Sequence, residues 1–179
     1  MRKGNLLLFA LLLPNLSWGD AAFPVENNLG IFGESDFKLY DLNRDACAEV
    51  AAYYLLAALR PDRKILYDDV LKKFSDKFGT RPYSFLAIEH YLFEEGIRSK
   101  ILKLECRDDI FEMDARHLIL YFPPLKEGFL GHFSYARRNS KDVWEIFDPE
   151  ISEFAAVPFA SESRLFKRWE GIFLLPQSK

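Results

Sequence analysis

Residues 45–59 read DACAEVAAYYLLAAL, and this segment is expected to form the central helix on which the other elements pack. It is rich in Ala and Leu, apolar on nearly every side, and closed by Arg60-Pro61, where proline stops a helix. A helix this apolar is expected in the middle of a domain rather than on its surface. Asp45 is the expected N-cap, which places Cys47 in the first turn.

Two amphipathic helices are predicted after this one. Over 67–78, apolar side chains recur at helical spacing, charged residues lie mostly opposite them, and Gly79 ends the pattern. Over 83–95, a second set of apolar residues is followed by Gly96, the residue type that commonly caps a helix C-terminus. The N-terminal half of the chain is therefore expected to be helical.

The periodicity then changes from helical to extended. Short runs of branched or aromatic residues predict strands over 101–105, 118–122, 129–137, 143–147 and 171–175. Brief helices are expected over 108–113 and 162–169, and the Asn-Ser-Lys-Asp of 139–142 predicts a hairpin turn. Helices first and antiparallel strands afterwards define an α+β domain, with N-terminal helices packed on a C-terminal antiparallel sheet.

Composition and charge exclude several classes of protein. The 179 residues are 49% apolar and 28% charged, with 17 Phe and a formal net charge of −3. These figures are typical of a folded chain with an aromatic core, and they exclude a disordered, collagen-like or multi-spanning protein. Positive and negative residues are mixed throughout, so no nucleic-acid partner is expected.

Residues 1–19 have the three-part layout of a secretory signal: a basic start, an unbroken apolar run over 6–13, and small residues up to Gly19. The apolar run is too short to span a bilayer, so cleavage after Gly19 predicts an exported protein, periplasmic or extracellular, with no stable membrane span. An uncleaved anchor is the alternative. Residues 20–37 are expected to form an irregular lead-in to one domain over 38–176.

Cys47 and Cys106 are the two cysteines of the chain. An exported protein meets oxidising conditions in which they can pair, yet one bridge is hardly a framework for a chain long enough to bury its own core. Both the bridged and the free state therefore stay open. Two Cys and three widely separated His show no metal-ligand spacing, so neither a metal nor a cofactor is expected.

Cys47 is the candidate nucleophile. In the first turn of a helix, unpaired backbone N–H groups and the positive end of the helix dipole favour an anion such as a thiolate. His132 and Asp148 flank the predicted hairpin, and antiparallel pairing places the start of one strand beside the end of the next. The base that a thiol needs, and the carboxylate that orients the base, are thus expected side by side.

Each of these three residues also has a structural alternative. A cysteine in an apolar helix is most often a small buried hydrophobe. A histidine in an aromatic strand is more often satisfied in the core, and Asp-Pro after a strand is usually a turn. The chain order and the mutual placement of Cys47, His132 and Asp148 favour the catalytic interpretation.

The same residues carry a resemblance to a known family. Asp-Ala-Cys-Ala at 45–48 and the helix behind it resemble the nucleophile helix of the peptidase C39-like family, the double-glycine leader peptidases of the papain-like cysteine peptidase superfamily. Gly-His-Phe at 131–133 and Phe-Asp-Pro-Glu at 147–150 match the later motifs of that family in order and spacing. The resemblance covers roughly 38–176.

The resemblance implies a papain-like fold and a cysteine-type peptidase that acts on a peptide or protein substrate without a cofactor. Cys47 would attack the peptide carbonyl, His132 would act as base and then as acid, and Asp148 would orient His132. The habit of the family implies cleavage after small residues such as Gly-Gly.

Two residues near the nucleophile depart from the family pattern. Active members carry a Gln where this chain has Asp41, and the Gln amide helps to hold the oxyanion; here Asn43 is the candidate donor. Ala48 replaces the usual Gly after the cysteine. The peptidase interpretation therefore has an alternative, a catalytically impaired C39-like domain that binds extended peptides. A structural domain unrelated to peptidases is the third possibility.

Overall fold

Three helices precede the strands in the part of the chain that the computed structural model describes, residues 46–78, 84–124, 131–148 and 156–177. The helices are α2 (Cys47–Leu59), α3 (Tyr67–Phe78) and α4 (Phe85–Glu94). The sheet and its short helices follow as β1 (Ser99–Lys103), η2 (Arg107–Phe111), β2 (His117–Phe122), β3 (His132–Arg138), β4 (Trp144–Phe147), β5 (Val157–Pro158), α5 (Arg164–Arg168) and β6 (Ile172–Pro176). The predicted α+β order is confirmed.

Within these residues the strands form one antiparallel sheet in the order β1-β6-β2-β3-β4-β5. β2 and β3 lie at its centre, and their pairing ends at Phe122↔His132. β3 and β4 form the predicted hairpin, in which the backbone N–H of Asn139 donates to the carbonyl of Val143 at 2.9 Å. The hairpin brings the start of β3 and the end of β4 to the same end of the sheet, as the sequence predicts.

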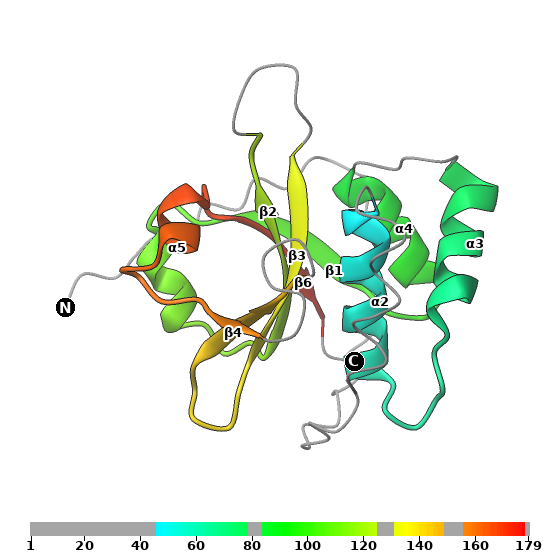
Figure 1. Ribbon diagram of the computed structural model, residues 1–179, viewed down its shortest axis with the longest axis horizontal. Coiled ribbons are helices and arrows are strands. Elements are labelled where there is room, and N and C mark those ends of the chain that lie inside the picture. The colour runs from blue at the N-terminus through cyan, green and yellow to red at the C-terminus, as the bar shows by residue number, and fades with distance from the viewer. Residues whose placement is uncertain (1–45, 79–83, 125–130, 149–155, 178–179) are drawn as a thin grey trace.

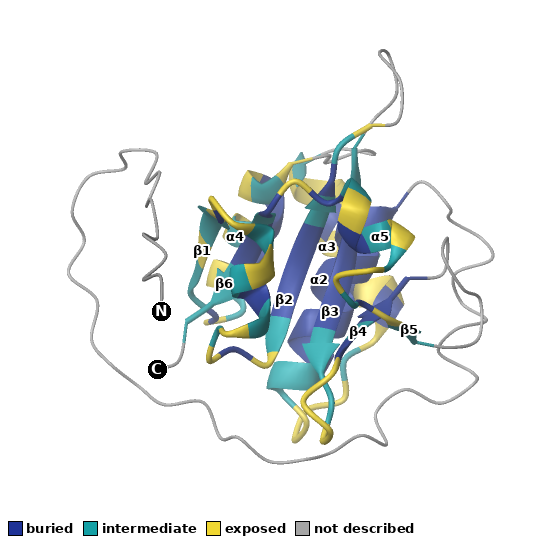
Figure 2. Ribbon diagram, turned by 90° about the vertical axis from the view of Figure 1, so that its left-hand side faces the viewer, coloured by how far each residue is buried: buried dark blue, intermediate teal, exposed yellow. Residues whose placement is uncertain are grey.

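Helices cover both faces of the sheet (Figure 1). α2 packs directly on one face with α3 and α4 outside it, and these three helices share a core with Ile119, Tyr135 and Phe147 of the sheet. α5 and η2 cover the other face, where a second core contains Trp144 and Trp169. β2 and β3 are mostly buried between the two cores (Figure 2).

α2 is buried on nearly all sides, as its apolar sequence predicts. Every residue from Cys47 to Ala57 is buried, and Tyr54 is fully enclosed. The expected cap is wrong, because Ala46 occupies the N-cap position and makes no side-chain cap hydrogen bond, while Asp45 lies outside the described residues. Cys47 nevertheless starts the helix, so the thiol belongs to the first turn as predicted.

α3 has the predicted bounds of 67–78, whereas α4 is shorter than expected. It begins at Phe85 because Ser84 caps it: Ser84 Oγ accepts a hydrogen bond from the backbone N–H of Ala87 at 3.1 Å. After the other end of α4, Gly96 adopts a φ of 76°, a left-handed conformation that glycine reaches without strain. The predicted glycine cap is confirmed.

The strand bounds differ from the predictions mainly at the edges of the sheet. β1 starts at Ser99, earlier than predicted, because an edge strand accepts polar residues that break an apolar pattern. β5 was not predicted, since two residues are too few for any periodicity and Pro158 suits only an edge. β3 starts at His132, and the predicted strand residues 129–130 lie outside the described part of the chain.

Candidate active site

Cys47 lies at the start of α2, the helix that packs on the sheet, and it is 8% exposed. Both cysteines are free thiols: Cys47 is buried, and Cys106 is exposed between β1 and η2. Of the two states left open by the sequence, the structure therefore has the free one, and the Cys47 sulfur is available for chemistry.

His132 and Asp148 meet at the end of the β3–β4 hairpin opposite its turn. Tyr135 pairs with Phe147, so the next step of the antiparallel register places Asp148 beside Ser134. Asp148 is 3% exposed, and its Oδ2 is in hydrogen-bond contact with Nε2 of His132. The predicted proximity of the His132 imidazole and the Asp148 carboxylate is therefore present.

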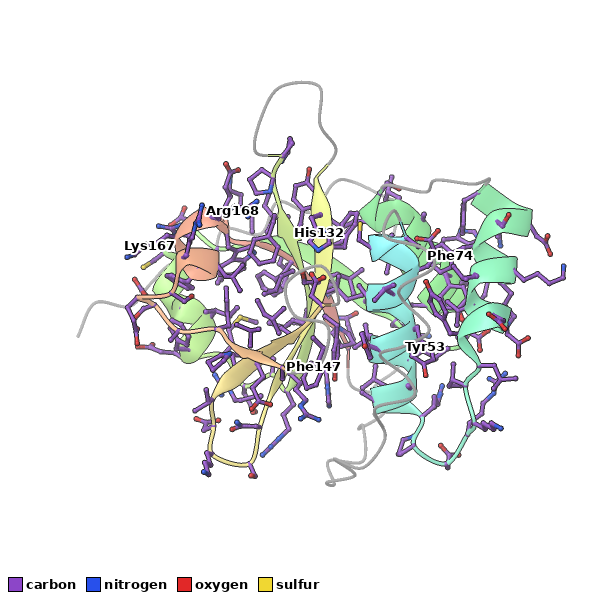
Figure 3. All side chains as sticks on the ribbon, in the orientation of Figure 1. Tyr53, Phe74, His132, Phe147, Lys167 and Arg168 are labelled. Carbon is purple, nitrogen blue, oxygen red and sulfur yellow. The ribbon has the colours of Figure 1, made fainter. Side chains whose placement is uncertain are left out.

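Cys47 completes the group, because its side chain hydrogen-bonds with that of His132. Nε2 of His132 is engaged by Asp148, which leaves Nδ1 as the ring nitrogen for the thiol. Figure 3 shows His132 at the start of β3, beside the first turn of α2. Three residues from α2, β3 and the segment after β4 thus come together in the order thiol, imidazole, carboxylate.

The charge state of His132 follows from these contacts. Burial alone lowers its pKa, but the hydrogen bonds with Asp148 and Cys47, together with the negative charges of those groups, raise the pKa of His132 well above its ordinary value. The imidazole therefore holds a proton between the carboxylate and the thiol. A protonated imidazole is the partner that stabilises a thiolate.

Ser134 belongs to the site although the sequence did not indicate it. It lies two residues after His132 on β3, so both side chains point to the same face of the strand. Ser134 is 1% exposed, and its Oγ donates a hydrogen bond to Oδ2 of Asp148. The signal that could have revealed it is its spacing from a candidate histidine, since alternate residues of a strand share their neighbours.

An aromatic stack holds the thiol helix against the two strands that carry the histidine and the aspartate. The Tyr54 ring of α2 stacks on Tyr135 of β3 at 5.7 Å between centroids. The ring centroid of Phe147 of β4, the residue immediately before Asp148, lies 6.1 Å from that of Tyr54 and 5.8 Å from that of Tyr135. Rings packed in this way hold α2, which carries Cys47, against β3 and β4.

The other two histidines lie outside this group. His117 stands at the far end of the β2–β3 pair, and its Nδ1 is 2.8 Å from the hydroxyl of Tyr135. Burial and the charges of Arg137 and Arg116 lower the pKa of His117 to about 4, so it is neutral at physiological pH. His90 lies on the exposed face of α4, 3.4 Å from a carboxylate oxygen of Glu94.

Of the residues near the expected oxyanion hole, the structure describes Ala48. Asn43 and Asp41 lie outside the described residues. Ala48 is 1% exposed and packs in the core of the helical layer. Its methyl group therefore lies inside the protein rather than on a surface that a substrate would meet.

Two features are absent from the described ranges: a metal-binding cluster and a helix that could span a membrane. No group of three or more His, Cys, Asp and Glu side chains in these ranges is arranged to hold a metal ion. Among the helices described, none combines the length and the apolar character needed to cross a membrane.

Comparison with known proteins gives a likeness of fold but not of sequence. No family model matches the chain, and no curated protein matches it. The peptidase domain of Streptococcus ComA, a bifunctional ABC transporter of a quorum-sensing pathway, is 16% identical with a TM-score of 0.56, over 76% of this chain and 93% of that one. A double-glycine-motif protease from an AMS/PCAT transporter, solved with its leader peptide, is 14% identical with a TM-score of 0.54, over 90% and 95%. The chain therefore has the fold of double-glycine peptidase domains.

Proposed function

We propose that this protein is a cysteine peptidase in which Cys47, His132 and Asp148 form the catalytic group. The observation that carries the proposal is the continuous contact from the Cys47 thiol through the His132 ring to the Asp148 carboxylate. The fold that it shares with peptidase domains supports the same function. A buried cysteine kept only for packing would not need a histidine whose other nitrogen is held by a buried carboxylate.

The reaction uses the three side chains in sequence. The Cys47 sulfur attacks the carbonyl carbon of the scissile bond while His132 holds the proton of the thiol. His132 then gives that proton to the leaving amine, and a thioester links the acyl group to Cys47. Water next attacks the thioester with His132 as base, which releases the acid and restores the thiol. Asp148 keeps the ring oriented throughout.

The oxyanion of each tetrahedral intermediate lies at the start of α2. The backbone N–H of Cys47 belongs to the first turn of α2, where N–H groups have no carbonyl partner within the helix, so it is the proposed first donor. Asn43 is the proposed second donor. Losing one such donor typically lowers the rate roughly a hundred- to a thousandfold, so a chain with Asp41 in place of the family's Gln is expected to be a slow enzyme.

The proposed substrate is an extended peptide or protein cleaved after small residues such as Gly-Gly. The support is the likeness to a double-glycine-motif protease and to the peptidase domain of a transporter. Residues 1–19 are proposed to be a signal peptide and 38–176 the peptidase domain, which makes the enzyme exported, periplasmic or extracellular. Residues 1–37 lie outside the described part of the chain.

The direct test is turnover of a peptide library containing Gly-Gly sites by matched cysteine variants. Cys47→Ala should abolish cleavage, whereas Cys106→Ala, which changes the exposed thiol, should cleave like the wild type. Cleavage that survives in Cys47→Ala overturns the proposal. If no variant cleaves any peptide but both cysteine variants bind one with equal affinity, the chain is the peptide-binding domain of the alternative interpretation.

A further inference from the structure

We propose that Ser134 is a positioning residue that holds the Asp148 carboxylate in the orientation His132 requires. This inference rests on the proposed function and goes beyond it, because the serine acts through the carboxylate and touches no reacting atom. Its starting point is that Ser134 Oγ and His132 Nε2 contact the same atom, Oδ2 of Asp148.

The buried Asp148 carboxylate requires hydrogen-bond donors, and Ser134 supplies one. At 3% exposure, Asp148 has little access to water, and a buried carboxylate is costly unless hydrogen bonds replace its hydration. Ser134 is itself only 1% exposed and lies on the central strand of the sheet. Because the strand fixes the position of the Ser134 backbone, its hydroxyl favours the carboxylate orientation in which Oδ2 of Asp148 lies against it.

The geometry also explains why a serine is found at this position. The neighbouring residues of β3, Phe133 and Tyr135, point to the other face and pack in the core of the helical layer. Leu120, the partner of Ser134 across the β2–β3 pair, belongs to the apolar core of the opposite face. A hydroxyl among apolar neighbours is unfavourable unless it has a specific partner, and here that partner is Asp148.

Removing the hydroxyl should therefore loosen the carboxylate and weaken its contact with His132. Hydrogen bonds to charged groups contribute enough that Ser134→Ala should lower kcat about ten- to a hundredfold with little change in KM. A His132 ring that is less firmly held by Asp148 keeps its proton less well and so stabilises the Cys47 thiolate less. The pH profile of iodoacetamide labelling of Cys47 should therefore move up by about one pH unit. Ser134→Thr keeps the hydroxyl and should restore the wild-type labelling profile.

The control is another serine whose hydroxyl has a purely structural partner. Ser163 caps α5 by accepting a hydrogen bond from the backbone N–H of Phe166 at 3.1 Å. Ser163→Ala should lower the melting temperature without moving the labelling profile of Cys47. Circular dichroism of each variant shows that it is folded at the temperature of the assay.

The outcomes separate the two proposals. If the wild type neither cleaves peptides nor labels Cys47 below the pH of an ordinary thiol, the proposed function fails and the role of Ser134 fails with it. If the wild type does both and Ser134→Ala matches it in kcat and in labelling profile, the role of Ser134 alone is overturned. A Ser134→Ala protein that melts lower but keeps the wild-type profile also overturns it, since that is the behaviour of a structural serine.

Discussion

His132 and His117 stand at opposite ends of the β2–β3 pair, and the fold gives them opposite proton affinities. Burial disfavours the charged form of both rings. At His132 the hydrogen bonds and charges of its two partners in the site overcome this effect and raise the pKa. At His117 the charges of two neighbouring arginines add to burial and lower the pKa to about 4. One histidine therefore retains a proton, and the other is a neutral partner of a tyrosine.

The buried His117 predicts a specific loss of stability in acid. Its pKa is about 4 in the folded protein. An unfolded histidine has a pKa of about 6.5, so the unfolded state binds more protons between these values. The stabilising contribution is therefore full above about pH 6.5 and declines as the pH falls towards 4, by up to about 3 kcal/mol.

Urea unfolding of the wild type and of His117→Gln at several pH values measures this effect. The Gln side chain can still hydrogen-bond the hydroxyl of Tyr135 but does not titrate. The difference in unfolding free energy between the two proteins should shrink or reverse between pH 7 and pH 4. Parallel curves over this range would show that His117 does not titrate in the way its environment indicates.

The placement of the three candidate catalytic residues was more predictable than that of the residue that contacts their carboxylate. Cys47, His132 and Asp148 could be named from helix position, chain order and the hairpin, because antiparallel pairing brings predictable strand ends together. Ser134 could not, since a serine within an aromatic strand belongs to no motif and its role depends on which way one carboxylate turns. Asn43, the predicted oxyanion donor, lies outside the described residues and stays a prediction.

At the scale of elements, strong periodicity predicted well and local capping predicted less well. The 67–78 helix, with its regular apolar spacing, has the predicted bounds. The start of α4 is set by one hydrogen bond, which Ser84 Oγ accepts from the backbone N–H of Ala87, and the apolar pattern alone does not locate such a cap. β5 forms by pairing with the edge strand β4, and such a pairing between distant segments leaves no periodic pattern in the sequence of 157–158.

Two glycines in left-handed conformations allow a test of the close backbone contact between Gly171, just before β6, and Leu104, just after β1. Gly171 precedes β6 with a φ of 83°, and a Cβ there would lie 2.9 Å from the backbone oxygen of Leu104. Gly96 has a φ of 76°, but a Cβ there would meet only the end of the flexible Arg60 side chain at 3.4 Å. The two positions share the backbone strain and differ in the clash.

Ala substitutions at both positions should therefore destabilise unequally. Gly96→Ala should lose about 1–2 kcal/mol, the usual penalty of a left-handed conformation. Gly171→Ala should lose clearly more unfolding free energy, because the backbone around Gly171 or Leu104, beside the paired strands β1 and β6, must shift to relieve the clash. Urea unfolding of the two variants measures the difference, and equal losses would contradict the clash.

At the scale of the whole molecule, the sheet separates two apolar cores, and the proposed active site depends mainly on one of them. The core of the helical layer contains Cys47, the stack of Tyr54 on Tyr135, and Phe147, which is tilted against both rings. The opposite core contains Phe166, which packs on Trp169 with ring centroids 6.1 Å apart. Both cores stabilise the fold, but only the first joins the thiol helix to the strands that carry its partners.

This division predicts different consequences for two aromatic truncations. Tyr54→Ala and Phe166→Ala should each lose about 3–5 kcal/mol of unfolding free energy, as large aromatic truncations in cores usually do. Assayed where both variants are folded, only Tyr54→Ala should also lose about a hundredfold in kcat, because a small displacement of Cys47 from His132 is enough. Equal kcat values in the two variants would show that the stack does not position the thiol.

The fold is similar to that of structures that share little sequence with this chain. At 14–16% identity to the two peptidase structures, most side chains differ. In this chain the fold is built on a pattern: one apolar helix in the middle, amphipathic helices beside it, and a hairpin that brings two strand ends together. Cores tolerate extensive apolar substitution when volume and patterning are kept, so this pattern is what sequence reasoning could use.

The central claim is that His132 and Asp148 activate Cys47, and the pH dependence of alkylation tests it most directly. The purified protein is labelled with iodoacetamide across a pH series, and each cysteine is followed by peptide mass, with exposed Cys106 as the reference in the same sample. Because burial slows labelling at every pH, the informative quantity is the pH at which the Cys47 rate is half its maximum. An activated thiolate predicts a midpoint well below about 8.5, the ordinary value for a thiol, and loss of that low midpoint in His132→Gln. A Cys47 midpoint at or above the ordinary value, unchanged in His132→Gln, would contradict the account.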